Sequence, residues 1–264
     1  MPTLPHTHVR SFGDGPRRAM AIHCTLAHSG MWAGLAKTLA DRLTITAYDL
    51  PSHGKSAEWT PDRDQHRMAT DMGLALLSEP MDLIGHSFGA TVALRMAVER
   101  PELVRSLTLI EPVYFAVALL DQPASVDAHN ASLSKYTAAI AAGDNDLAAR
   151  LFNREWGNGT QWVDIPETAR RYMADRIHFV PGGQPFLMHD NANLLASGGL
   201  GKLTMPVLLI QGEHTPDVID AVHAALARRI AKPIRVTIAG AGHMSPITHP
   251  QAVAQQILKL IEVS

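Results

Sequence analysis

A serine flanked by glycines is the residue pattern in this chain that most directly indicates chemistry. Residues 85–89 read Gly-His-Ser-Phe-Gly, with Ser87 at the centre. This G-x-S-x-G pattern lies between an apolar run and a helix-forming run, the setting of a sharp strand-to-helix turn that exposes a serine hydroxyl. The glycines keep side chains out of the crowded turn, and the helix start favours developing negative charge. The pattern predicts that Ser87 is a nucleophile and that the backbone N–H of Phe88 is one oxyanion donor.

A serine hydroxyl is a poor nucleophile at neutral pH and needs a base beside it. Residues 239–250, AGAGHMSPITHP, place His243 in a glycine-rich loop between the last apolar run and the last helical run. Loops at the carboxyl end of a sheet are where such folds bind their ligands. We therefore predict that His243 is the base. His249 is expected to cap or pack against the final helix, and His86 is expected to be structural.

Short apolar runs alternate with helix-period segments, and this alternation must position both residues. It predicts an α/β fold with a mostly parallel sheet flanked by helices. Strands are expected at 19–24, 43–48, 81–85, 106–111, 206–211 and 234–240, with an edge strand near 8–12. Helices are expected at 31–42, 66–78, 88–100, 218–230 and 251–261.

The segment from 114 to 197 breaks the alternation, because it contains helical stretches and no convincing strand. So long a helical insertion is expected to be a cap rather than a loop. The predicted organisation is a core made of residues 1–113 and 198–264, with a helical cap at 114–197. Its aromatic residues are expected to roof an apolar pocket: Tyr114, Phe115, Phe152, Trp156, Trp162, Tyr172 and Phe179.

Composition excludes several other classes of function. The 264 residues carry a formal net charge of −2 with scattered basic residues, which argues against a nucleic-acid groove or an anionic membrane surface. The single cysteine, Cys24, permits neither an intramolecular disulfide nor a cysteine-based zinc site. The histidines are dispersed, so no metal and no cofactor are expected. The chain shows no secretory signal and no run of transmembrane length, which predicts a cytoplasmic protein without membrane insertion.

The chain resembles the alpha/beta-hydrolase family with a helical cap over nearly its whole length. The motifs that carry the resemblance are AIHCTLAHSGMW, YDLPSHGKS, GHSFG, LTLIEP, PVLLIQGEH and AGHMSPITHP. The resemblance implies that His243 is the catalytic histidine and that the backbone N–H of Thr25 is the second oxyanion donor. Two positions depart from the family, because Cys24 and Ser52 stand where it usually has glycine. Cys24 itself is expected to be a small buried thiol rather than a nucleophile.

The family's usual acid is missing. Most members have an aspartate shortly after the strand at 206–211, where it orients the histidine, but this chain has Thr215. Glu111 ends the strand at 106–111, and relatives similar to haloalkane dehalogenases place their acid there. Asp217 lies two residues beyond the usual position, and a third reading has no functional acid. We predict Glu111 as the acid, with Asp217 as the alternative.

These residues predict a serine hydrolase that cleaves a carboxylic ester or related acyl substrate through an acyl-enzyme. Two alternatives remain open: a carbon–carbon bond hydrolase or lactonase with the same serine and histidine, and a non-catalytic ligand-binding homologue. The expected partner is a small apolar acyl or ester substrate. An apolar face of the cap would also allow a homodimer.

Overall fold

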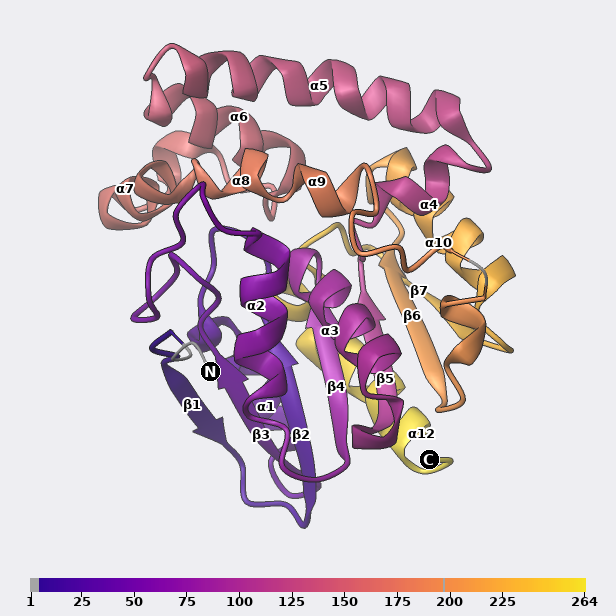
Figure 1. Cartoon of the computed structure of the whole chain (residues 1–264). Helices are drawn as coiled ribbons and strands as arrows, with labels where there is room; N and C mark the ends of the chain where they lie inside the picture. The colour runs from indigo at the N-terminus through magenta and orange to yellow at the C-terminus, as the bar shows by residue number, and fades with distance from the viewer. Residues whose placement is uncertain (1–4, 197) are drawn as a thin grey trace.

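The computed structural model describes residues 5–196 and 198–264, and these form a mostly parallel sheet of seven strands (Figure 1). The strand order is β1-β3-β2-β4-β5-β6-β7, and only β1 runs antiparallel to its neighbour in the described chain. The strands are β1 Val9–Phe12, β2 Arg17–Ile22, β3 Leu43–Tyr48, β4 Met81–His86, β5 Val104–Ile110, β6 Val207–Gly212 and β7 Ile234–Ile238. The predicted fold class is confirmed.

The central strands are apolar along their length because both faces of the sheet are covered. In β2, Met20 and Ile22 belong to one hydrophobic cluster, whereas Ala19 and Ala21 belong to the other. Successive side chains of a strand point to opposite faces, so a strand between two helical layers must be apolar at every position. This is why continuous apolar runs, rather than alternating ones, marked the strands.

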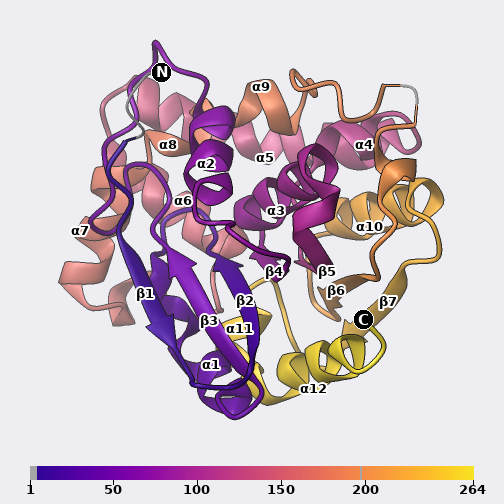
Figure 2. The same cartoon turned by 60° about the horizontal axis from the view of Figure 1, so that its bottom comes forward.

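Helices form one layer on each face of the sheet (Figure 2). One face is covered by α1 Ala33–Leu39 and α12 Pro250–Ile261, and the other by α2 Gln65–Leu74, α3 Phe88–Glu99 and α10 Asp217–Arg229. In α12, Val253, Ile257 and Leu260 are buried at spacings of three and four residues, so one side of the helix meets the sheet. Short helical turns occur at α11 Ser245–Thr248, Ser29–Trp32, Pro101–Leu103 and Leu200–Lys202.

Between β5 and β6 the described residues form helices and no strand. They are α4 Phe115–Leu119, α5 Pro123–Ala141, α6 Asn145–Trp156, α7 Glu167–Arg176, α8 Phe179–Gly182 and α9 Gln184–Leu187, with a 3-10 turn at Trp162–Asp164. Figure 1 shows them above the carboxyl ends of the parallel strands. The predicted limits at residues 1 and 197 lie outside the described residues. No helix in the described ranges is long and apolar enough to cross a membrane.

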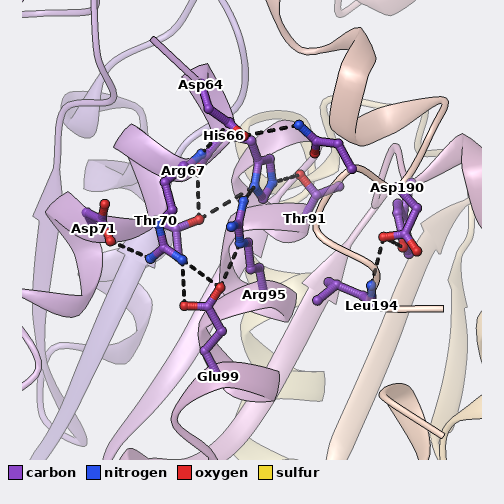
Figure 3. Close-up of polar contacts among 12 residues, drawn as sticks. Asp64, His66, Arg67, Thr70, Asp71, Thr91, Arg95, Glu99, Asp190 and Leu194 are labelled. Atoms are coloured by element: carbon purple, nitrogen blue, oxygen red, sulfur yellow. Dashed lines mark hydrogen bonds and ion pairs between the residues drawn. The ribbon is translucent and has the colours of Figure 1, made fainter. Parts of the chain in front are cut away.

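A polar network joins α2 to α3, the helix that follows the turn around Ser87 at residues 85–89, called the elbow below (Figure 3). Arg67 of α2 donates to both carboxylate oxygens of Glu99 at 2.7 Å, and Arg95 of α3 donates to the same carboxylate at 2.8 Å. Arg95 also lies 3.3 Å from Nδ1 of the buried His66. Because one carboxylate binds two guanidinium groups, the network holds α2 and α3 in a fixed relation.

Candidate active site

Ser87 occupies a strained turn between β4 and α3. Its backbone adopts φ 55° and ψ −117°, in a region that residues with a side chain rarely enter. A Cβ on Gly85 would lie 2.5 Å from the carbonyl oxygen of Gly89, and a Cβ on Gly89 would lie 2.3 Å from that of Ile22. Both glycines are therefore required by close backbone contacts, as the elbow pattern predicted.

Glu111 and His243 come together at the carboxyl end of the sheet. Glu111 follows β5 and His243 follows β7, and the Oε2 atom of Glu111 lies 2.9 Å from Nδ1 of His243. Both side chains are buried. A carboxylate only accepts hydrogen bonds, so Nδ1 of His243 carries the proton and Nε2 is left as a proton acceptor.

Thr215 is part of this arrangement, although it carries no charge. Its hydroxyl donates to Oε2 of Glu111, and the backbone N–H of Gly212 donates to Oε1 at 2.6 Å. Burial raises the pKa of Glu111, but the hydrogen bond and charge of His243, with the bonds from Thr215 and Gly212, outweigh it and lower the pKa below its usual value. Glu111 is thus held ionised. Asp217 instead begins α10, and no hydrogen bond in the described chain joins it to His243.

The loop that carries His243 is fixed from the elbow. Nε2 of His86 lies 2.8 Å from the carbonyl oxygen of His243 and donates to it, as predicted for a structural histidine. The ring of Trp156 meets the His243 ring edge-on at 4.7 Å between centroids. No hydrogen bond between Ser87 and His243 is present in the described residues, and such bonds commonly form only when substrate binds. His249 occupies the N-cap position of α12, but its side chain makes no capping hydrogen bond.

Of the two predicted oxyanion donors, Phe88 belongs to the elbow itself and Thr25 follows β2, the strand beside β4. The N–H groups of Thr25 and Phe88 donate to no protein acceptor in the described ranges, and both residues line the same cavity as Ser87. Free, oriented N–H groups of this kind are what an oxyanion hole requires. Beside them, Cys24 is buried, and burial raises the pKa of its thiol to about 12. The thiol stays protonated at neutral pH, so Cys24 is not an activated nucleophile.

A small apolar cavity of about 50 Å³ lies in front of Ser87. Some of the aromatic cap residues predicted to roof this cavity line it, and others do not. Phe115, Phe152, Trp156 and Phe179 line the cavity, whereas Tyr114, Trp162 and Tyr172 do not. Tyr136 of α5, which the sequence did not single out, also lines it. The cap helices therefore cover the cavity and also form a small hydrophobic cluster, in which Tyr136, Ala148 and Ile177 pack together with Leu26 of the loop after β2.

The described residues offer no group of three or more histidine, cysteine, aspartate or glutamate side chains that could hold a metal ion.

A family model described as the alpha/beta hydrolase fold matches residues 20–250, which is most of the chain. The protein belongs to the alpha/beta hydrolase fold family. Its elbow and the loop of His243 lie within the matched range, as do Thr25, Glu111 and the helices above the sheet.

Relatives within this family include enzymes that act on esters. The chain is 28% identical to lipase LipV of Mycobacterium tuberculosis, and the match covers 95% of each protein. It is also 28% identical to the pimeloyl-[acyl-carrier protein] methyl ester esterase of Methylococcus capsulatus, over 97% of this chain and 98% of the relative. The crystal structure of carboxylesterase CesB from Bacillus subtilis matches with a TM-score of 0.70 at 17% identity, covering 99% of this chain and 89% of that one. At that identity the structural match shows the fold alone.

Two contacts of this alpha/beta hydrolase were not anticipated from its sequence. Thr215 donates a hydrogen bond to Glu111, whereas the sequence indicated only the loss of a charge. Tyr172 of α7 does not line the cavity, and its hydroxyl instead donates to the carbonyl oxygen of Ala27 and accepts from the N–H of Gly54. The family resemblance indicated that Glu111 could serve as the acid, but no pattern in the cap sequence distinguished Tyr172.

Proposed function

We propose that the protein is a serine hydrolase that cleaves a carboxylic ester with a short apolar acyl group. Ser87 is the nucleophile, His243 the general base and Glu111 the acid that orients it. The single observation that carries the proposal is the 2.9 Å contact between Glu111 and His243, both buried at the carboxyl end of the sheet. In acyl transfer to a serine, a buried carboxylate orients the neighbouring histidine and stabilises the imidazolium that forms.

In the first half-reaction the Ser87 oxygen attacks the ester carbonyl carbon, and Nε2 of His243 takes the hydroxyl proton. The carbonyl electron pair moves to the oxygen, which the N–H groups of Thr25 and Phe88 stabilise. The carbon–oxygen bond to the alcohol then breaks, and His243 returns the proton to the departing alkoxide. Glu111 stabilises the imidazolium that exists between these two proton transfers, without itself accepting a proton.

In the second half-reaction a water molecule attacks the acyl-enzyme. His243 takes one proton from the water, and the same two N–H groups hold the negative oxygen. The bond between the acyl carbon and the Ser87 oxygen then breaks, and the proton on His243 passes to that oxygen. The carboxylic acid leaves, and the serine and histidine return to their starting states.

The volume and the lining of the cavity support the proposal that the acyl group is short and apolar. Its lining includes Phe115, Phe152, Trp156 and Phe179, and its volume is about 50 Å³. Pockets that enclose drug-sized ligands are several times larger. The esterase and lipase relatives support ester cleavage as the reaction, and the aromatic lining supports an apolar acyl chain over a charged one.

The test is labelling by an alkyl fluorophosphonate, which forms a bond to an activated serine oxygen with loss of fluoride. The expected result is one label per wild-type chain and none in Ser87→Ala. Glu111→Gln is expected to slow labelling at least about 100-fold, because the imidazolium loses its counter-charge.

Asp217→Asn is the matched control, since it neutralises the alternative carboxylate at the start of α10. It is expected to label at the wild-type rate. Sharp slowing in Asp217→Asn, with Glu111→Gln unaffected, would move the acid to Asp217. A folded wild-type protein that takes no label would instead support the ligand-binding alternative.

A further inference from the structure

The loop that carries the Thr25 oxyanion donor has a strained backbone. Leu26, the next residue, adopts φ 63°, in the left-handed region that disfavours residues with a side chain. Such a conformation is strained and persists only where surrounding contacts fix it. The contacts that hold residues 24–28 therefore decide whether the Thr25 N–H points toward the reacting carbonyl.

One of these contacts comes from the core. The N–H of Leu26 donates to Nε2 of His53 at 3.0 Å, and Nδ1 of the same ring donates to the carbonyl of Pro51 at 2.8 Å. His53 is buried, and its ring meets Phe179 of the cap edge-on at 4.6 Å. Loop 50–54 thus supports the oxyanion loop through one imidazole.

A second contact comes from the cap. The hydroxyl of Tyr172 in α7 donates to the carbonyl oxygen of Ala27 at 2.8 Å and accepts from the N–H of Gly54 at 2.9 Å. One cap side chain therefore bonds both loops, 145 residues from one partner and 118 from the other. A Cβ on Gly54 would lie 1.9 Å from the Asp49 carboxylate, so position 54 has no room for a side chain.

The Tyr172 ring is itself held in place within α7. The guanidinium carbon of Arg176 lies 3.8 Å from the centre of the ring, and its Nη1 donates to the Tyr172 carbonyl oxygen at 3.2 Å. On the core side, the ring of His28 meets it edge-on at 5.9 Å. The hydroxyl is directed at the two loops by its own helix, so it moves wherever α7 moves.

We propose that Tyr172 is a positioning residue. Through it, the Thr25 donor of the oxyanion hole is in place only while α7 of the cap packs against the core. The proposal rests on the proposed function, since it concerns the same site. When α7 lies on the core, Tyr172 and His53 fix the loop around Leu26 from two sides, and the Thr25 N–H is aimed at the cavity. When α7 lifts, the hydroxyl leaves Ala27 and Gly54, the strained backbone relaxes and that donor is lost.

Loss of an oxyanion donor acts on the transition state more than on the bound substrate, because the negative oxygen exists only in the former. Tyr172→Phe removes the hydroxyl and keeps the ring. It is expected to lower kcat about 10-fold or more while KM for a short-chain aryl ester changes by less than about 3-fold. A merely structural loosening of the cap would instead raise KM.

Tyr114→Phe is the matched control. Tyr114 is buried, and its hydroxyl donates to Asp190 Oδ1 at 2.6 Å, so this bond joins two segments of the cap and does not involve residues 24–30. Three quantities are compared in both variants: kcat and KM, the rate of fluorophosphonate labelling, and amide hydrogen exchange of the peptide covering residues 24–30. In Tyr172→Phe, slower labelling and faster exchange in this peptide are expected, with wild-type behaviour in Tyr114→Phe.

Unchanged exchange of residues 24–30 in a folded Tyr172→Phe variant would overturn the proposal, as would an equal loss of kcat in Tyr114→Phe. The exchange measurement needs no catalysis. If the wild-type protein takes no label, the hydrolase function fails, and the exchange of residues 24–30 still decides whether Tyr172 holds the loop.

Discussion

The Glu111 carboxylate lies 2.9 Å from Nδ1 of His243, although 132 residues separate them along the chain. The sheet explains this contact. β5, β6 and β7 are adjacent parallel strands, so the residues that follow them meet at one edge. A carboxylate after β5 therefore reaches the same imidazole as one after β6, and Thr215, at the latter position, donates a hydrogen bond to Glu111 instead.

Thr215→Val tests the value of that hydrogen bond while keeping the shape of the side chain. Removing a donor to a buried carboxylate is expected to lower the free energy of unfolding by about 1.5–3 kcal/mol. It should also lower kcat several-fold, because Glu111 is less firmly oriented. Chemical denaturation and ester hydrolysis measure the two effects. Thr137→Val is the control, since within the described residues its hydroxyl bonds only to carbonyls of α5, and an equal loss there would contradict the prediction.

Gly89→Ala tests the steric basis of the elbow. The new methyl would lie 2.3 Å from the carbonyl oxygen of Ile22 and 2.4 Å from that of His23, so α3 and β2 must separate. The free energy of unfolding is expected to fall by about 3 kcal/mol or more. Gly34→Ala in α1 is the control, because its methyl meets nothing within 4 Å. That variant should be up to about 1 kcal/mol more stable than the wild type, and a similar loss in both would refute the steric explanation.

Buried histidines should make the protein sensitive to acid. Burial lowers the pKa of His23 and His223 to about 4 and of His86 to about 3, and it lowers those of His53 and His66 well below the ordinary value. Below pH 6.5 the unfolded chain binds these protons and the folded chain does not. The stability that these neutral histidines allow is therefore fully present above pH 6.5. As the pH drops toward 4, the free energy of unfolding falls by up to about 1.4 kcal/mol per pH unit for each histidine. Thermal unfolding between pH 4.5 and 8 measures this slope.

His223→Leu should reduce that slope. Both ring nitrogens of His223 are buried without a hydrogen-bond partner in the part of the chain that the structure describes. The side chain therefore lowers the free energy of unfolding at acid pH and offers no hydrogen bond to offset this loss. The variant is expected to melt at a higher temperature than the wild type at pH 5, with a smaller difference at pH 8. A pH-independent difference between the two proteins would contradict this assignment.

Trp156→Ala should change the acyl chain length that the protein accepts. Trp156 lines both the 50 Å³ cavity at Ser87 and a neighbouring groove of about 380 Å³, which also share Thr25 and Phe152. Removing the indole joins the two spaces. The variant is expected to prefer longer acyl esters than the wild type, measured as kcat/KM across a series of aryl esters from acetate to octanoate. An unchanged preference would show that Trp156 does not limit chain length.

The sheet was predictable because its physical signal is local. A strand covered on both faces must be apolar at successive positions, and such runs placed β3 at Leu43–Tyr48 as observed and the other strands within a few residues. β5 begins at Val104 rather than at 106, because Arg105 is tolerated within it: its guanidinium reaches the carbonyl oxygen of Pro80. The short α11 turn, Ser245–Thr248, has too few residues for a periodic signal and was not predicted.

The candidate site was predictable only where one short segment defines the geometry. Ser87 and the flanking glycines form such a segment, and backbone contacts account for each of them. Glu111 and Asp217 remained alternatives because strand order brings several carboxylates to one edge without showing which reaches His243. Tyr172 was counted with the pocket aromatics, because only the packing of α7 decides where a cap side chain points.

The hydroxyl of Thr215 touches the carboxylate of Glu111, so the two positions cannot both be acidic without conflict. An aspartate at 215 would bring two carboxylates together, and their repulsion would strongly raise the pKa of one of them. The residues at 111 and 215 are therefore epistatic: glutamate at the first favours a neutral donor at the second. If the acid moves between positions 111 and 215 by one substitution at a time, the intermediate sequence has either two carboxylates at these positions or none.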